Sequence, residues 1–267
     1  MLKAIFLIFG TYMTVHSINA SEHLISHTVS NKHKINLDRH IARIKKIKEP
    51  TIPLEQELNL LNQLSKFELG KFILENKGLN GYWTSYVIRK APKNKSLTEL
   101  ENWIINSAPI VRATQERFCI FQQILQQNLK NSMNIASIPC GLMDDLYSLN
   151  YDKVSNITLT GIDLDSHSIA LARKRASEQH VRSHLYIKNA WNLNTINSYN
   201  IIASNGLNIY EHDDQKVTKL YKEFFKALKP SGLLVTSFVT PPKALSKEST
   251  WKNFNQEDVI KQKALFS

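Results

Sequence analysis

The sequence predicts an α/β fold, a parallel sheet with helices on both faces, preceded by a mainly helical segment. Short apolar runs alternate with amphipathic stretches from residue 134 to residue 240. Strands that alternate with helices typically form a parallel sheet covered on both sides. A Pro-Cys-Gly turn follows the first apolar run, and Asp163 ends the second. Residues 54–130 carry helical periodicity without this alternation, so the helical segment comes first in the chain.

The first half of the α/β region reads as a strand, a tight turn, a helix and a second strand. Residues 134–138 are short and apolar enough for a buried strand, and the turn at 139–141 leads into a helix over 142–149. A second strand is predicted over 157–162. Asp163 follows it directly, so its carboxylate is expected at the carboxyl edge of the sheet.

The second half repeats the alternation and completes a Rossmann-like sheet. We predict helices over 166–179 and 213–228, and strands over 185–187, 200–204 and 233–238.

Asp163 is the most informative single residue. It lies about 20 residues beyond the first turn, the separation at which dinucleotide-type folds place an acid that binds ribose hydroxyls. Aspartate also caps helix N-termini. We favour ribose binding for Asp163 and the capping role for Asp165.

The motifs "ITLTGIDLD", which contains Asp163, and "LKPSGLLV" at 228–235 stand in an arrangement that resembles the class I S-adenosylmethionine-dependent methyltransferases. The resemblance covers residues 134–240 and implies S-adenosyl-L-methionine as the cofactor, with no metal. It implies cofactor contacts at Pro139, Cys140, Gly141, Asp163, Leu164, Asn189, Ala190, Trp191, Ser204 and Asn205.

Two positions depart from the family pattern. Only Gly141 remains of the Gly-x-Gly-x-Gly turn, and Pro139 lacks a backbone N–H. Asn189 stands where many relatives have aspartate, although its amide can still accept a hydrogen bond. We expect these changes to weaken cofactor binding more than to abolish it. Trp191 either stacks on adenine or packs in the core.

Methyl transfer from a sulfonium is a direct in-line displacement, so alignment matters more than acid–base chemistry. Asn205 or Tyr210 could orient the acceptor and Glu211 could take its proton; alternatively, these residues cap the next helix. The acceptor is expected to be a small molecule or a protein, since the Asn-Pro-Pro-Tyr motif of nucleobase methylation is absent. The alternatives are a degenerate, cofactor-binding or inactive relative, and another Rossmann-like nucleotide protein.

Residues 21–130 are expected to form a helical accessory segment that caps the cofactor. Tyr82, Trp83 and Arg117 are its candidate pocket residues. In the alternative interpretation the aromatic rings pack the helices, and Arg117 pairs with Glu116 or with a carboxylate of the sheet.

Residues 1–20 look like a secretory signal or membrane anchor, with Lys3 before an apolar stretch of about 12 residues and Ala20 at a potential cleavage point. The signal indicates export or anchoring, whereas the cofactor indicates the cytoplasm. Export, an interfacial anchor and a misassigned start all stay open.

Residues 131–267 are assigned to the methyltransferase domain. After Phe238 the sequence offers no convincing strand pair, so we expect the two last strands of the family to be missing and the sheet to stop at five. The net charge of +11 comes without the basic and aromatic interleaving of a nucleic-acid module, which disfavours nucleic acid as a partner. Cys119 and Cys140 indicate neither a disulfide framework nor a metal site.

Overall fold

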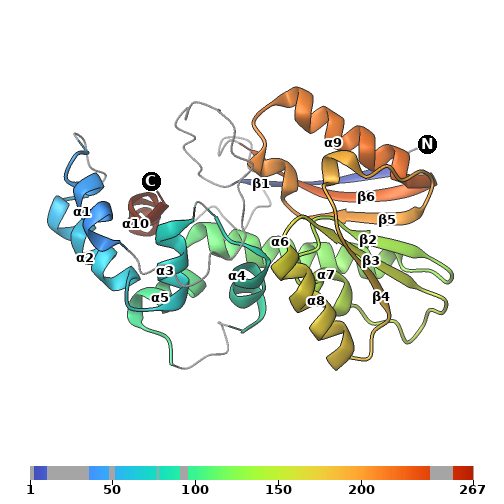
Figure 1. The fold of residues 1–267 in the computed structure, drawn as a ribbon, viewed down its shortest axis with the longest axis horizontal. Coiled ribbons are helices and arrows are strands. Elements are labelled where there is room, and N and C mark those ends of the chain that lie inside the picture. Colours follow the sequence, from blue (N-terminus) through green and yellow to red (C-terminus); the bar gives the residue numbers. More distant parts are fainter. Residues whose placement is uncertain are drawn as a thin grey trace.

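A six-stranded parallel sheet and a separate group of helices make up the molecule (Figure 1). The computed structural model describes residues 3–10, 36–47, 52–76, 78–90, 96–240 and 255–266. The strand order is β1-β6-β5-β2-β3-β4. In chain order, the strands are β1 (Lys3–Gly10), β2 (Asn134–Ser137), β3 (Thr158–Asp163), β4 (Ser183–Ile187), β5 (Tyr199–Ser204) and β6 (Leu228–Thr240).

The five strands from β2 to β6 confirm the predicted Rossmann-like sheet. The chain runs from β2 outwards to β4, then returns to the other side of β2 with β5 and β6. All the neighbouring pairs are parallel. Their carboxyl ends therefore meet at a single edge, and ligands of open α/β sheets bind at this edge, beside the point where the strand order reverses.

The sheet does not stop at five strands, which corrects the expectation from the sequence. β1 pairs with β6 in parallel from Lys3 opposite Leu233 to Gly10 opposite Thr240. An edge strand presents a row of unpaired N–H and C=O groups, and an extended apolar segment satisfies them by adding to the sheet. This pairing gives residues 3–10 a structural use and does not support their interpretation as part of a signal.

Helices cover both faces of the sheet, and alternate strand residues divide between the two faces. One face is covered by α6 (Pro109–Asn128), α7 (Asp144–Tyr147) and α8 (Ser166–Glu178), and the other by α9 (Asp214–Ala227). In β5, Ile201 and Ala203 pack towards the α6 face and Ile202 towards the α9 face. This alternation follows from the two-residue period of a strand.

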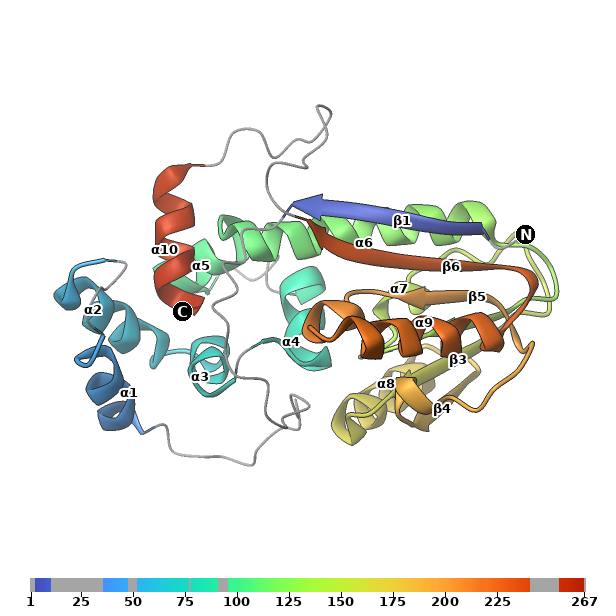
Figure 2. The ribbon, with the colours of Figure 1, turned by 90° about the horizontal axis from the view of Figure 1, so that it is seen from above.

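The helical segment has a core of its own, formed by α2 (Leu54–Leu64), α3 (Glu68–Glu75), α5 (Glu99–Asn106) and the beginning of α6. Figure 2 shows α6 extending from this group to run beside β1 and β6. The remaining elements are α1 (Leu37–Ile44), α4 (Gly81–Ser85) and the π-helical turn η1 (Tyr86–Lys90). No helix in the described ranges is long and apolar enough to cross a membrane.

The C-terminal helix α10 (Gln256–Phe266) packs on the helical segment and not on the sheet (Figure 2). The Trp103 indole N–H donates to Asp258 Oδ1 at 2.6 Å. The backbone N–H of Ile110, at the start of α6, donates to Gln262 Oε1 at 2.6 Å. The helix falls within residues 131–267, which the sequence predicts as the methyltransferase domain. In the structure Gln262 of this helix caps α6, which lacks a capping side chain of its own.

Candidate functional site

The turn after β2 and the end of β3 are joined directly at the carboxyl edge of the sheet. Gly141 has a positive φ of 48° and donates its N–H to Asp163 Oδ2 at 2.8 Å. Asp163 Oδ1 accepts the N–H of Asp165 at 3.0 Å. Burial raises the pKa of Asp163, and these backbone hydrogen bonds oppose the rise. Each carboxylate oxygen keeps a further lone pair for a ligand hydroxyl.

The other two turn residues are fixed by the strands beside them. The N–H of Cys140 donates to Ile162 O at 2.9 Å, and the N–H of Ile138, before Pro139, donates to Ala203 O at 2.8 Å. Burial raises the pKa of the Cys140 thiol well above its usual value, with Asp163 adding to the effect. Cys140 is therefore a protonated, buried turn residue and not a thiolate nucleophile.

Asp165 is the N-cap of α8, as expected. Its side chain accepts the backbone N–H groups of His167 and Ser168, and the Ser168 hydroxyl at 2.7 Å. The two carboxylates therefore have different roles. Asp165 is buried and caps α8, whereas Asp163 is half-buried and lies at the sheet edge.

Apolar side chains stay exposed beside Asp163. Leu164, the next residue, is 54% exposed, and so is Ile187, which lies opposite Asp163 in the register of β3 and β4. Exposed aliphatic side chains next to a polar site are suited to the face of a flat apolar ring.

The next turn, in the 3₁₀ helix η3 (Ala190–Asn192), is built from residues that already have partners. Asn189 caps η3, with Oδ1 accepting the Trp191 N–H at 2.9 Å. The Trp191 indole N–H donates to Lys216 O at 2.9 Å, and the ring packs against the α9-side core. Ala190 is buried in the same core. The geometry therefore favours a packing role for Trp191.

Helix α4 of the helical segment lies against the first turn. A Cβ on Gly81 would stand 2.8 Å from Gly141 Cα and 2.5 Å from Ser168 Oγ, so only glycine permits this approach. The preceding Asn80 is buried and caps α4 by accepting the Trp83 N–H at 3.0 Å, while its Nδ2 has no partner. The helical segment therefore covers the turn directly.

An ion cluster ties that cover to the sheet. Asp144, in α7, pairs with Arg175 of α8 and with Arg89 of η1, the latter at 3.1 Å. Arg89 also donates to Ser148 Oγ at 2.8 Å, and Arg175 to Ser85 Oγ at 3.3 Å. These contacts join α4 and η1 to the two helices that flank the first turn.

The neighbouring Asp145 is buried, and no cation among the described residues lies within ion-pair distance of it. Its Oδ2 accepts the Ser137 hydroxyl at 2.7 Å and its Oδ1 accepts the Leu146 N–H at 2.9 Å. Burial raises its pKa to about 7, against the effect of these hydrogen bonds. Because this pKa lies near neutral pH, small structural changes in the turn will change the fraction of Asp145 that is protonated.

The end of β5 carries the predicted catalytic candidates. Ser204 is buried, Asn205 is half-buried, and a left-handed Gly206 with φ of 89° starts the 3₁₀ helix η4 (Leu207–Tyr210). Tyr210 is 45% exposed as a whole residue. Burial of its hydroxyl raises its pKa, while Arg117 lowers it.

Glu211 serves the helix that follows. Its Oε1 accepts the Asp213 N–H at 3.0 Å and its Oε2 lies 3.6 Å from Lys216 Nζ. This geometry favours the capping alternative over a proton acceptor.

The three candidate pocket residues of the helical segment have different surroundings. Trp83 is packed among aromatic rings, with centroids 4.9 Å from Tyr82 and 5.2 Å from Tyr86, which supports the packing alternative for this residue. Arg117 instead reaches the sheet edge, where both terminal nitrogens lie 3.5 Å from the position a Cβ of Gly206 would take. Within the described ranges it has no carboxylate within ion-pair distance.

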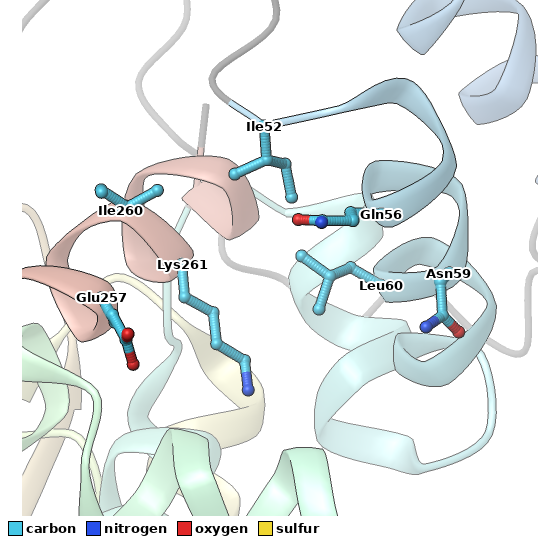
Figure 3. A pocket seen from close by; sticks show the side chains of 7 residues that line it. All are labelled: Ile52, Gln56, Asn59, Leu60, Glu257, Ile260 and Lys261. Carbon is cyan, nitrogen blue, oxygen red and sulfur yellow. The ribbon is translucent and has the colours of Figure 1, made fainter.

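A hollow of about 370 Å³ lies elsewhere, between α2 and α10 (Figure 3). It contains none of the residues that the sequence singled out. Its lining combines aliphatic, amide and charged side chains: Ile52, Gln56, Asn59, Leu60, Glu257, Ile260 and Lys261.

Sequence reasoning missed Asn80, Arg89, Asp144 and Arg175, although their arrangement controls the first turn. Two adjacent aspartates shortly after the Gly141 turn were a signal of buried acids. The cations that pair with Asp144 lie 55 residues before it and 31 residues after it, so no local spacing could pair them.

Comparison with known families identifies the α/β region. The family described as "Methyltransferase domain" matches residues 129–265. No curated protein matches the chain.

A solved structure has the same fold over most of the chain. A crystal structure from Bordetella parapertussis, described as a possible exported protein, is 37% identical, with a TM-score of 0.79, 86% of this chain covered and 79% of that chain. An S-adenosylmethionine-dependent methyltransferase from Geobacter sulfurreducens, in complex with S-adenosyl-L-homocysteine, is 21% identical with a TM-score of 0.37, covering 45% of this chain and 47% of its own. One from Methanosarcina mazei is 24% identical with a TM-score of 0.37, covering 42% and 55%.

Proposed function

Because the chain belongs to the class I S-adenosylmethionine-dependent methyltransferases, we propose that it transfers a methyl group from S-adenosylmethionine to an acceptor held at the carboxyl ends of β5 and β6. One observation carries the proposal. The Gly141 turn and the Asp163 carboxylate, which the family uses for the methionine end and the ribose of the cofactor, are in direct contact at 2.8 Å. The two parts of a cofactor site are thus assembled at one strand edge.

Asp163 is assigned to the ribose hydroxyls. It is half-buried, both oxygens are oriented by backbone N–H groups, and each can accept once more. A carboxylate whose position is fixed in this way binds a diol without first losing side-chain freedom.

The adenine is assigned to the apolar surface beside Asp163. Leu164 supplies exposed aliphatic area there, with Asn189 and Ala190 at the next strand end. Asn189 Oδ1 can accept once more after capping η3, so it can take an exocyclic amine hydrogen. Trp191, within η3, contributes by packing this turn against the α9-side core.

The methionine end is assigned to Gly141, with Pro139 and Cys140 shaping the turn and α4 closing over it. S-adenosylmethionine supplies an activated methyl group. The protein's residues align the acceptor and exclude water. Asn205 and Tyr210, at the end of β5 and in η4, are placed to orient the acceptor, with Ser204 beneath them.

Calorimetric titration of the full chain with S-adenosylhomocysteine tests the proposal. We expect saturable binding that Asp163→Ala weakens about 10- to 150-fold, because a hydrogen bond to a charged group contributes roughly 1.5–3 kcal/mol. Asp152→Ala, which removes an exposed loop carboxylate, is the matched control and should bind like the unaltered protein. A folded protein that does not bind would overturn the cofactor assignment, and binding unaffected by Asp163→Ala would overturn the role of Asp163.

A further inference from the structure

A polar cluster lies above the apolar core on the α6 face of the sheet. It consists of Arg117, Asn205 and Ser237, and we call it the interlayer cluster. Asn205, the first residue after β5, continues the alternation of Ile201 and Ala203, which face α6. In β6, Ser237 continues the stripe of Leu233 and Val235 in the same way. The two residues are next to each other because Ser204 pairs with Thr236.

Arg117 is the member of the interlayer cluster that comes from helix α6. It precedes Phe121 by one turn of α6, and Phe121 packs on the same core as those strand stripes. The end of α6 leads into the start of β2, so the earlier half of the helix lies towards the carboxyl edge of the sheet. The guanidinium accordingly lies against Gly206, in the loop that follows β5.

Each member of the interlayer cluster has a buried polar atom with no hydrogen-bond partner in the described structure. These atoms are Arg117 Nε, Asn205 Oδ1 and Ser237 Oγ, and Asn208 Oδ1 in the adjoining η4 is a fourth. Ser237 is 0% exposed. Most buried polar atoms in proteins are hydrogen-bonded, so four such atoms on neighbouring segments indicate a missing polar occupant.

The positive charge of Arg117 indicates that the missing occupant is an anion. Arg117 has no carboxylate within ion-pair distance in the described ranges, and buried charges are normally paired. A guanidinium presents its donors in a planar fork that matches two oxygens of one anion. The Ser237 hydroxyl and the Asn205 amide N–H₂ can donate to such an anion. The unpartnered Oδ1 atoms of Asn205 and Asn208 are acceptors, so they suit an N–H or O–H group of the same molecule.

We propose that the interlayer cluster binds the oxyanion of the methyl acceptor, so that the acceptor is a small molecule carrying a carboxylate or a phosphate. This proposal rests on the proposed function, because it assigns the anion to the acceptor and not to the cofactor. The first turn, where the cofactor's methionine end is assigned, lies at β2, and the interlayer cluster spans β5 and β6.

Fluorine NMR of the full chain tests the proposal with three small probes. Fluoroacetate carries a carboxylate, monofluorophosphate a phosphate, and fluoroacetamide is the uncharged counterpart of fluoroacetate. Each is titrated with and without saturating S-adenosylhomocysteine. We expect at least one anion to bind at least tenfold more tightly than fluoroacetamide, and the tighter anion identifies the acceptor as a carboxylate or a phosphate.

Substitutions test whether the anion binds at the interlayer cluster. Arg117→Met should weaken anion binding at least tenfold, and Arg117→Lys, which keeps the charge but loses the fork, about threefold. Ser237→Ala should also weaken it. Arg112→Met is the matched control, because Arg112 is exposed on the same helix. Thermal unfolding of each variant verifies that it is folded.

Equal binding of fluoroacetamide, no binding of either anion, or binding unaffected by Arg117→Met and Arg117→Lys would overturn the proposal. So would a tenfold loss of S-adenosylhomocysteine affinity in Arg117→Met, since the arginine would then serve the cofactor. If the unaltered protein does not bind S-adenosylhomocysteine, the proposed function fails. The titrations without it still decide whether an anion site exists.

Discussion

Asp145 shows how a single buried residue can make the stability of this protein depend on pH. Its carboxyl group lies beneath the first turn with two hydrogen bonds and, among the described residues, no cation within ion-pair distance. Burial raises its pKa from 3.8 to about 7. The folded protein therefore holds this proton more tightly than the unfolded chain does, and the free energy of unfolding should fall as pH rises from about 4 to about 7.

Asp145→Asn should remove this dependence, because the amide does not titrate. We expect the variant to gain stability relative to the unaltered protein between pH 4 and pH 8, by up to about 4 kcal/mol at roughly 1.4 kcal/mol per pKa unit. Urea unfolding at several pH values measures the difference. Asp152→Asn, at an exposed loop position, is the control. A difference between Asp145→Asn and the unaltered protein that does not change with pH would contradict this account.

Single residues could be predicted from the sequence where the reason is local. The capping role of Asp165 follows from its position before a helix, and the placement of Asp163 from its position after a strand. The partners of Asp144 could not be predicted, because an ion pair between distant segments depends on the packing of three helices.

At the scale of elements, the first turn is held between the sheet and the helical segment. Asp144 accepts from Arg175 on α8 and from Arg89 on η1, so one carboxylate joins three elements. Gly81 lets α4 reach the turn without a clash. The cofactor turn and its cover should therefore be stabilised together.

Asp144→Ala should be strongly destabilising, because it leaves two cations beside each other without their shared anion. We expect a loss of roughly 3–5 kcal/mol, reduced because Arg89 is 36% exposed. Glu178→Ala is the control on α8: Glu178 pairs with Lys174 at the surface and should contribute less than about 1 kcal/mol. Equilibrium unfolding in urea measures both, and equal effects would refute the role of Asp144.

The packing partners of two elements could not be predicted from the sequence, and the reason is the same for both. A short apolar run such as residues 3–10 suits a signal, a buried helix or a strand equally well, and only the free edge of β6 selects a strand. Helix α10 comes after the last strand in the sequence, but its hydrogen bonds are with Trp103 and Ile110 of the helical segment. Periodicity therefore predicts whether a segment is a helix or a strand better than it predicts which element the segment packs against.

At the scale of the whole molecule, residues 3–10 extend the sheet beyond β6 as its edge strand. Without β1, the backbone N–H and C=O groups of β6 that now pair with it would lack strand partners. Export of the chain stays a prediction, and it conflicts with this arrangement only if residues 3–10 are removed.

Deletion of residues 1–10 should therefore lower the melting temperature by at least about 4 °C, which is roughly 1–2 kcal/mol for a chain of this size. It should also promote aggregation through the free edge. A chain lacking only residues 1 and 2 is the control, since β1 begins at Lys3. Scanning calorimetry and light scattering measure the two effects. An unchanged melting temperature would show that β1 is dispensable and would favour a removable segment.

The central claim is that the carboxyl ends of β2 and β3 hold S-adenosylmethionine while those of β5 and β6 face the acceptor. A crystal structure of the full chain with S-adenosylhomocysteine tests it most directly. We predict ribose hydroxyls on Asp163, the methionine end at Gly141 and the sulfur directed towards Asn205. A ligand bound elsewhere, such as in the hollow between α2 and α10, or a ribose that does not touch Asp163, would contradict the claim.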